Sequence, residues 1–422
     1  MPSNYELIGK HIRLVDVRNK DLKVERLVGL SITKRFIASV ANVVGTDMAN
    51  YKIIKKGQFA CSIMQVRRDG KMPVALMEEY EEAIISQAYP VFEVIDEAEL
   101  LPEYLMMWMS RSEFDRHACF LAVGGVRGSL EWEDFLEMEL PIPHIDVQRA
   151  MVKEYNTITD RIALNEQLNQ KLEETAQTLY RQWFVDFEFP YDFEKGEPSL
   201  KGKPYKSNGG EMVWCAELDK DIPRGWEAKT IEEVVDLGRG SSPRPIVDYI
   251  STEGTPWIKI ADATRSMNQF LLETKECITD EGVPKSRLLP PGTLILANSG
   301  SLGTYQILDI EACAHDGWHI FYQWNLVTRQ FMTQALIFHN DDILTSAYGS
   351  VFTNLKLDYL KEYILNVPDK KTLNFFTQIV LEIEKWQLIL AKENSKVEKL
   401  RSLLLSKMST VEVGAGGGVG VG

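Results

Sequence analysis

The residues from 146 to 184 constrain the fold of this chain more than any other segment. They contain no Gly and no Pro, and steps of four and three residues from Met151 reach a nearly apolar set of positions. Such a heptad pattern predicts a long helix with one buried seam. At about 1.5 Å per residue the helix would extend for roughly 55–60 Å, longer than an ordinary globular helix. The predicted seam consists of Met151, Tyr155, Ile158, Ile162, Asn165, Asn169, Leu172, Ala176, Leu179 and Trp183.

A second segment near the C-terminus repeats this pattern and is a natural partner for the first. The two seams align at a single offset of 225 residues (376 − 151), which superposes Asn169 on Asn394. Two matching heptad helices in one chain predict an intramolecular coiled coil. The second seam consists of Phe376, Val380, Ile383, Gln387, Leu390, Asn394, Val397, Arg401, Leu404 and Met408.

The whole chain is predicted to be a duplicated unit, in which each domain is followed by a helix. The offset of 225 also pairs Pro143 with Pro368, but Gly57 matches Gly292 only at an offset of 235, which indicates an insertion in the second domain. The predicted parts are a first domain at 1–145, a central helix at 146–188, a connector at 189–221, a second domain at 222–369, a C-terminal helix at 370–410 and a flexible Gly-rich tail at 411–422.

Both globular regions combine strand-like and helix-like patterns, which predicts the α+β class. Residues 101–119 are typical of a helix, and Pro141 and Pro143 make the approach to the central helix extended. The predicted strands include residues 10–17, 31–36 and 58–66 in the first domain and 257–260, 293–297 and 320–323 in the second.

Composition limits the class of protein. A length of 422 residues with 45% hydrophobic content is enough for more than one domain core, and no apolar run approaches about 20 residues. The N-terminal residues lack the apolar core of a signal peptide, so we expect a cytoplasmic protein that does not enter a membrane. Five cysteines lie far apart without a CxxC pair, which favours a reducing compartment and argues against structural zinc.

The formal net charge of −14 hides a strong asymmetry along the first domain. Residues 1–71 hold 14 basic and 6 acidic residues, a balance of +8, whereas residues 72–139 hold 3 basic and 16 acidic residues, a balance of −13. Two interpretations are open: the segments are two solvated faces of one domain, or a basic face binds a polyanion while an acidic back meets something else.

A search for catalytic motifs finds none that predicts an active site. No GxxxxGK[ST] motif is present, and the glycines at 124–128 are more typical of a turn than of a dinucleotide or methyl-donor loop. His315 and His319 lie four residues apart, but Gly317 interrupts them and strand-like residues follow, so a structural role is favoured over a metal pair. We therefore predict no catalytic residue and no metal site.

The polar residues instead predict a binding surface in each domain. Lys and Arg suit phosphates and guanine, Asn suits adenine, and small side chains in loops supply further donors. For each pair alone a solvated surface is the favoured interpretation, but two sets held apart by a stiff rod favour duplex recognition. The candidates are Lys34, Arg35, Lys55, Lys56, Arg67, Arg68 and Arg127 in the first domain, and Arg239, Arg244, Lys259, Asn298, Ser299, Ser301, Tyr348 and Asn354 in the second.

Several motifs resemble those of the DNA-specificity subunits of type I restriction–modification systems. The resemblance spans nearly all of residues 1–410, although the first domain, residues 1–145, lacks a counterpart of the GW and PWI motifs. It rests on LPIPHIDVQ at 140–148, LNEQLNQKLEETAQTLYRQWFVDFEFP at 164–190, YKSNGGEMV at 205–213, IPRGWE at 222–227, PWIKI at 256–260 and YILNVP at 363–368.

The resemblance implies a non-catalytic α+β subunit in which an antiparallel coiled coil of two long helices separates two target-recognition domains, with pseudo-twofold symmetry. Each domain would read one half of a bipartite site in double-stranded DNA, and the coiled coil would set the spacer. It also implies two methyltransferase subunits and further restriction subunits as partners, and S-adenosylmethionine, ATP and Mg in those partners only. Two alternatives are a coiled-coil scaffold that joins two proteins without reading DNA, and a self-sufficient methyltransferase or nuclease with an unrecognised site.

Overall fold

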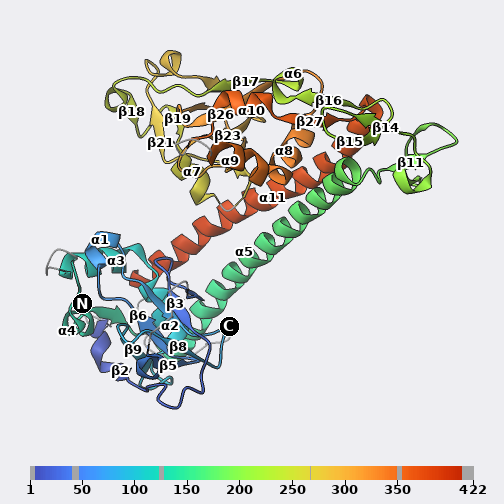
Figure 1. Cartoon of the computed structure of the whole chain (residues 1–422). Helices are drawn as coiled ribbons and strands as arrows, with labels where there is room; N and C mark the ends of the chain where they lie inside the picture. Colours follow the sequence, from blue (N-terminus) through green and yellow to red (C-terminus); the bar gives the residue numbers. More distant parts are fainter. Residues whose placement is uncertain (1–4, 40–46, 123–127, 267, 349–353, 411–422) are drawn as a thin grey trace, which may run out of the picture. The chain divides into compact units, whose positions relative to one another are not determined.

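The chain divides into two compact units, each of which contains a globular domain and part of both long helices (Figure 1). The first unit comprises residues 1–162 and 396–422, and the second comprises residues 163–395. Among the residues that the structure describes, no helix has the length and apolarity needed to cross a membrane. The computed structural model describes residues 5–39, 47–122, 128–266, 268–348 and 354–410, without the side chains of residues 346–348 and 410.

In the described part of the first unit, a four-stranded antiparallel sheet has the order β2-β9-β6-β7. Its Val-, Ile- and Phe-rich strands bury one face on the helices, and Phe59 and Phe92 stack with their ring centroids 4.9 Å apart. The strands are β1 (Tyr5–Leu7), β2 (Ile12–Val15), β3 (Val28–Leu30), β4 (Phe36–Ala38), β5 (Lys52–Lys55), β6 (Phe59–Cys61), β7 (Val74–Leu76), β8 (Glu82–Ile85), β9 (Val91–Val94) and β10 (Glu139–Pro141), and the helices are α1 (Val66–Asp69), α2 (Pro102–Met109), α3 (Ser112–Leu121) and α4 (Trp132–Leu136).

Two of the local predictions for this unit are wrong. Residues 31–35 form the turn between β3 and β4 rather than a strand, because the Lys34 amide donates to the Ser31 carbonyl at 3.1 Å and Lys34 adopts a φ of 62°. The single helix predicted over 101–119 is two helices. Ser110 donates its hydroxyl to the Met106 carbonyl at 2.8 Å, and Arg111 is extended, so the chain turns between α2 and α3.

The second unit contains two five-stranded sheets among its described residues, ordered β17-β26-β23-β24-β20 and β18-β21-β19-β25-β22. Their cores include the fully buried rings of Trp257, Trp318 and Phe321. The strands are β16 (Glu227–Thr230), β17 (Val235–Arg239), β18 (Ile250–Ser251), β19 (Thr255–Ile258), β20 (Phe270–Leu271), β21 (Glu276–Ile278), β22 (Leu288–Leu289), β23 (Leu294–Ala297), β24 (Tyr305–Leu308), β25 (Ala312–Ala314), β26 (Trp318–Trp324) and β27 (Ile364–Val367), and the helices are α6 (Ile231–Val234), α7 (Ile260–Arg265), α8 (Arg329–Phe338), α9 (Asn340–Tyr348) and α10 (Leu357–Glu362).

The two units repeat one topology. The order β2-β9-β6-β7 recurs as β17-β26-β23-β24, and the antiparallel pair β1–β10 recurs as β16–β27. Gly57 and Gly292, which precede β6 and β23, share a left-handed backbone with φ of 83° and 86°. The offset between β10 and β27 is again 225 residues (364 − 139). The segment between β17 and β23 is longer than its counterpart between β2 and β6, and it contains four strands of the second five-stranded sheet: β18, β19, β21 and β22.

The long helices are α5 (Ile145–Tyr180), which continues into a five-residue π turn, and α11 (Lys370–Lys407). All the heptad positions of both seams are buried or half-buried, whereas most residues between them are exposed. Within the second unit, the Asn165 amide donates to the Asn394 side-chain oxygen at 2.8 Å, and the rings of Trp183 and Phe376 lie 5.6 Å apart. Later residues of α5 therefore meet earlier residues of α11, so the helices run in opposite directions along this contact.

The segment at 189–221 was predicted to be a connector with little periodicity, but it packs on the second domain. Phe189 stacks between Tyr205 and Trp226, with ring centroids 4.6 and 5.2 Å away. These aromatic contacts anchor a small sheet. Its strands are short and separated by polar turn residues, so the sequence shows no strand pattern there. Its strands are β11 (Pro190–Asp192), β12 (Glu197–Pro198) and β13 (Lys203–Pro204), followed by the hairpin of β14 (Met212–Cys215) and β15 (Lys220–Pro223).

Candidate nucleic-acid interface

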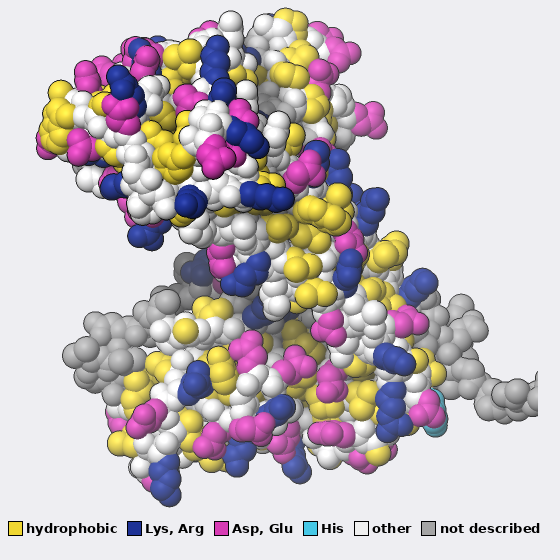
Figure 2. Space-filling model, turned by 90° about the vertical axis from the view of Figure 1, so that its right-hand side faces the viewer, with side chains coloured by type: hydrophobic (Ala, Val, Ile, Leu, Met, Phe, Trp, Pro, Cys, Tyr) yellow, Lys and Arg dark blue, Asp and Glu magenta, His cyan; other side chains and the backbone are white. Residues whose placement is uncertain are grey.

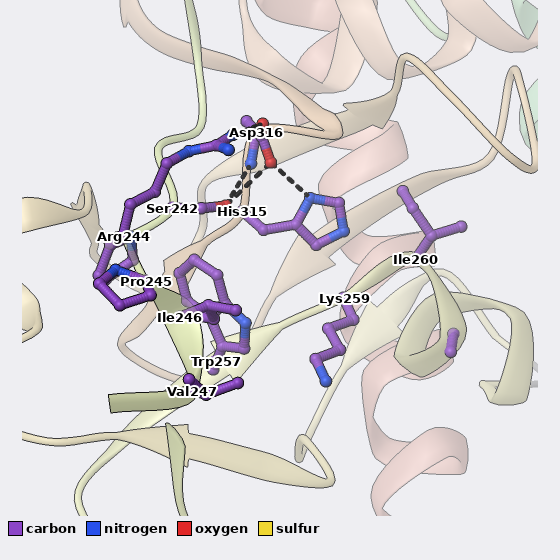
Figure 3. A pocket seen from close by; sticks show the side chains of 12 residues that line it. Ser242, Arg244, Pro245, Ile246, Val247, Trp257, Lys259, Ile260, His315 and Asp316 are labelled. Carbon is purple, nitrogen blue, oxygen red and sulfur yellow. Dashed lines mark hydrogen bonds and ion pairs between the residues drawn. The ribbon is translucent and has the colours of Figure 1, made fainter. Parts of the chain in front are cut away.

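Three segments of the second unit converge on a pocket with a volume of about 870 Å³. The loop after β17 forms one wall, Lys259 and the start of α7 form another, and the turn before β26 closes the site (Figure 3). Predominantly apolar side chains line the pocket, and charged groups lie at its rim. The lining residues are Ser242, Pro243, Arg244, Pro245, Ile246, Val247, Trp257, Lys259, Ile260, Ala261, His315 and Asp316.

Asp316 connects several of the predicted binding residues. Its backbone carbonyl accepts hydrogen bonds from Arg239 Nε at 2.6 Å and from Asn298 Nδ2 at 3.1 Å. Its carboxylate accepts from Ser242 Oγ at 2.9 Å and from Arg244 Nη2 at 3.4 Å. The structure therefore brings Arg239, Arg244 and Asn298 together around a residue that the sequence analysis did not select.

The surroundings of this cluster favour a charged Asp316 and a neutral His315. Burial tends to raise the pKa of Asp316, but the hydrogen bond from Ser242, a backbone hydrogen bond and the positive charge of Arg239 outweigh it, so the pKa lies below its usual range. Burial lowers the pKa of His315, which favours the neutral imidazole. Lys259 forms an ion pair with Glu276, whereas the Arg244 side chain is 82% exposed. Arg244 is thus the cation most open to an anionic or acceptor-rich partner.

The remaining candidates of the second unit have different surroundings. Asn298 is only 2% exposed, so it lies beneath the surface of the site and holds the Asp316 backbone. Ser299 and Ser301 are half-buried, and Asn354 is exposed. The side chain of Tyr348 lies outside the described residues.

The two histidines of the HDGWH segment make separate contacts. His319 Nε2 lies 2.8 Å from the Leu355 carbonyl, and His315 Nδ1 accepts from the Gly317 amide at 2.6 Å. No group of three or more potential metal ligands occurs among the residues that the structure describes. The two imidazoles serve the packing of this turn.

In the first unit, Lys34 is buried rather than presented to a ligand. Its side chain is 8% exposed, its amine lies 2.8 Å from the Asp115 carboxylate, and it also donates to the Met109 carbonyl. Burial lowers the pKa of Lys34 despite this ion pair. The placement contradicts the prediction that Lys34 contacts DNA, because the amine has exchanged water for partners within the domain.

The other described candidates of the first unit are exposed: Arg35, Lys55, Lys56, Arg67 and Arg68. The Arg67 amide donates to the carbonyl of Gly128 at 3.1 Å, so α1 lies against the end of the predicted glycine turn. Arg127, within that turn, falls outside the described residues. The remaining exposed cations are compatible with phosphate contacts, because a long flexible side chain can bind a phosphate without being held in one orientation.

The basic and acidic segments of the first domain are interleaved in space. Ion pairs join Arg13 to Glu93, and Lys56 to Glu81 at 3.3 Å. The face of the molecule in Figure 2 likewise mixes basic and acidic side chains over the lower unit. In these two pairs, a residue of the basic segment and a residue of the acidic segment therefore neutralise one another.

A second cation cluster, absent from the sequence analysis, occupies the corresponding place in the first unit. Arg18 follows β2 as Arg239 ends β17, and its guanidinium lies 2.9 Å from the Asp16 carboxylate. Lys52 Nζ donates to the carbonyl of Tyr89, just before β9, at 2.9 Å.

Comparison with known proteins defines the class. Two parts of the chain, residues 34–174 and 223–392, match the type I restriction modification DNA specificity domain. Because these matches cover most of the 422 residues, the chain belongs to this family. It is a DNA-recognition subunit, as the sequence motifs indicated, and neither a scaffold indifferent to DNA nor a self-sufficient enzyme.

Particular relatives agree with this assignment. The chain is 21% identical over 321 residues to the MjaIX specificity subunit of Methanocaldococcus jannaschii, covering 75% of this chain and 70% of the relative. It is 22% identical over 427 residues to the HindI specificity subunit of Haemophilus influenzae, covering 89% and 90%. A crystal structure of the type I S subunit from M. genitalium has a similar fold, with a TM-score of 0.54, 15% identity and coverage of 96% and 95%.

Proposed function

We propose that this specificity subunit reads a bipartite site in double-stranded DNA, one half with each globular domain. The observation that carries the proposal is the repeated topology, β2-β9-β6-β7 and β17-β26-β23-β24, with cations that follow β2 in one copy and lie at the end of β17 in the other. A repeated reader is suited to a target with two separate halves, as in other two-part DNA-binding proteins.

The DNA-contacting residues are proposed from the exposed cations of each unit. In the first unit Arg35, Lys55, Lys56, Arg67 and Arg68 would contact phosphates, and Arg127 remains a candidate. In the second unit the rim of the pocket would face the duplex, because its apolar lining and its cations combine base and phosphate contacts. The list of proposed contacts there is Arg239, Arg244, Lys259, Ser299, Ser301, Tyr348 and Asn354.

The pair of α5 and α11 is proposed to be an antiparallel coiled coil that sets the spacer between the half-sites. Support comes from the two unexposed heptad seams and from the opposite helix directions at Asn165 and Asn394. A helix pair resists bending more than an extended linker does, so it suits the role of a ruler.

Two methyltransferase subunits are the proposed partners, with restriction subunits completing the complex. S-adenosylmethionine, ATP and Mg would then be held by those partners. With a net charge of −14, the chain alone should bind DNA weakly and lose that binding further as salt increases. Tight, salt-insensitive DNA binding by the isolated chain would contradict the proposal that the partner subunits supply part of the affinity for DNA.

The deciding experiment is methylation mapping of DNA from cells that carry this chain with the methyltransferase of its system. We expect a split motif with methyladenine in both halves. The matched control is the same cell without this chain, which should lack the motif. An active methyltransferase that modifies no split motif in the presence of this chain would overturn the proposed function.

A further inference from the structure

We propose that Arg244, positioned by Asp316, reads a guanine in the half-site bound by the second domain. This inference rests on the proposed function and adds the base that is read, the residue that reads it and the residue that aims the reader. It concerns one wall of the pocket described above.

Arg244 has the exposure and the free donors that base reading requires. Its side chain is 82% exposed, and its only polar contact among the described residues is the one from Nη2 to Asp316 Oδ2, at 3.4 Å. A guanidinium carries five N–H donors in a planar fork. One edge can therefore lean on Asp316 while the other donors remain open to a ligand.

Asp316 is anchored firmly enough to give Arg244 a direction. Ser242 Oγ donates to its carboxylate at 2.9 Å, and its backbone carbonyl binds Arg239 and the nearly fully buried Asn298. These contacts come from the end of β17 and the loop after it, and from the residue that follows β23. Because Asp316 is held at its carboxylate and at its backbone carbonyl, it limits the orientations of the Arg244 guanidinium. A fixed orientation is required to read a base, whereas a purely electrostatic contact does not require one.

The pocket rim fits the edge of a base pair. Pro245 and the 76% exposed Val247 provide apolar surface beside Arg244, with the buried Trp257 behind them (Figure 3). Guanine presents two adjacent acceptors, N7 and O6, in the major groove, which match two parallel guanidinium donors. Adenine replaces the second acceptor with an amino donor, so Arg244 would discriminate against it.

A phosphate would satisfy the same guanidinium but would carry no sequence information. The two ligands therefore differ in what a substitution changes. Losing a guanine contact alters the base preference at one position, whereas losing a phosphate contact weakens all sequences alike. A phosphate contact is accordingly the outcome that the experiment must exclude.

The experiment selects bound DNA from a library randomised in both half-sites, using the chain assembled with the methyltransferase subunit of its system. For the unaltered complex we expect a guanine in the second half-site. Arg244→Gln, Arg244→Lys and Asp316→Asn should each reduce that guanine preference about tenfold and leave the first half-site unchanged. Arg244→Lys should keep most of the affinity, because the charge remains without the two-pronged geometry.

The control is Arg224→Gln, which removes another exposed arginine of the same unit, one paired with Glu211, and should alter no base preference. Since Arg244 is so exposed, its variants should unfold like the parent protein, and they decide the question even if Asp316→Asn fails to fold. A uniform loss of affinity with unchanged preference would overturn the inference in favour of a phosphate contact. A bipartite motif without an Arg244-dependent guanine would overturn the inference alone, whereas no bipartite motif at all would overturn the proposed function.

Discussion

Buried charges explain why residues of the same type have different roles in this chain. Lys34 and Arg35 are neighbours in one turn, yet Lys34 is paired with Asp115 inside the domain and Arg35 is exposed. In the second unit, Glu384 is 3% exposed and is held by Arg329 at 2.7 Å and by the Gln330 amide at 2.8 Å. A charge in such a place stabilises the fold only as long as its partner is present.

Lys34→Ala should therefore destabilise the first unit instead of selectively weakening DNA binding. It leaves the Asp115 carboxylate buried without its cation, at a cost of about 3–5 kcal/mol. Arg35→Ala is the matched control, with an expected change within about 0.5 kcal/mol. Denaturant unfolding of the two variants measures both effects, and equal stabilities would contradict the structural role of Lys34.

Glu173, on α5, predicts a pH dependence of stability in the second unit. Burial, and to a smaller extent the nearby Glu384, raise its pKa above the ordinary value of 4.5, although Gln387 donates to it at 3.1 Å. A raised folded-state pKa means that the folded protein holds the proton more tightly than the unfolded chain. This contribution is fully present below pH 4.5 and is lost as the pH rises through the raised value.

Glu173→Gln should then raise the thermal unfolding midpoint at neutral pH and flatten its dependence on pH above 4.5. Glu174→Gln is the control, because the next carboxylate is exposed and a hydrogen bond from Lys171 lowers its pKa. Thermal unfolding followed across the acidic to neutral range supplies the measurement. An unchanged midpoint for Glu173→Gln would show that the ionised carboxylate does not destabilise the folded protein at neutral pH.

At the scale of elements, the polar residues inside the helix seams distinguish one pairing from others. Asn165 is fully buried, and its amide nitrogen donates to Asn394 across the α5–α11 contact. The side-chain oxygens of Asn165 and Asn169 are both buried without a partner among the described residues. The repeat makes Asn169, and not Asn165, the equivalent of Asn394. The polar pair is therefore asymmetric, and it favours one register of the two helices over shifted ones.

Replacing one member of this pair should cost more than replacing both. Asn394→Leu strands the buried Asn165 amide, with a loss of about 1–3 kcal/mol, whereas the double variant with Asn165→Leu should be close to neutral. Asn169→Leu serves as the comparison and should not destabilise, since it removes an oxygen that has no partner. A double-mutant cycle in denaturant measures the coupling, and additive effects would show that the pair does not act as a unit.

At the scale of the whole molecule, the proposed ruler makes a quantitative prediction. Inserting one heptad into both α5 and α11 adds about 10 Å of helix, which corresponds to roughly three base pairs of axial rise. Methylation mapping should then report the same two half-sites with a correspondingly longer spacer. A four-residue insertion is the control, because it breaks the heptad register, and an unchanged spacer after the heptad insertion would overturn the ruler.

Several features of this protein were predictable because they depend on local patterns repeated many times. Heptad periodicity over about ten turns identified both long helices, and the 225-residue offset anticipated the repeat of β10 in β27. Gly57 and Gly292 were paired by sequence alone, and both prove to need a left-handed backbone that glycine adopts without strain. The family motifs are likewise contiguous in the chain.

Which charges are available and which are already paired depends on the packing of distant segments. Arg244 meets Asp316 across 72 residues, and Lys34 meets Asp115 across 81, through loops whose paths no local pattern specifies. A lysine next to an arginine is the same basic pair in the sequence whether its amine faces water or a buried carboxylate. Local sequence patterns were enough to identify the two long helices, the repeat and the family. The packed structure decided the members of the site, because desolvation and partner distance exist only once the strands are assembled.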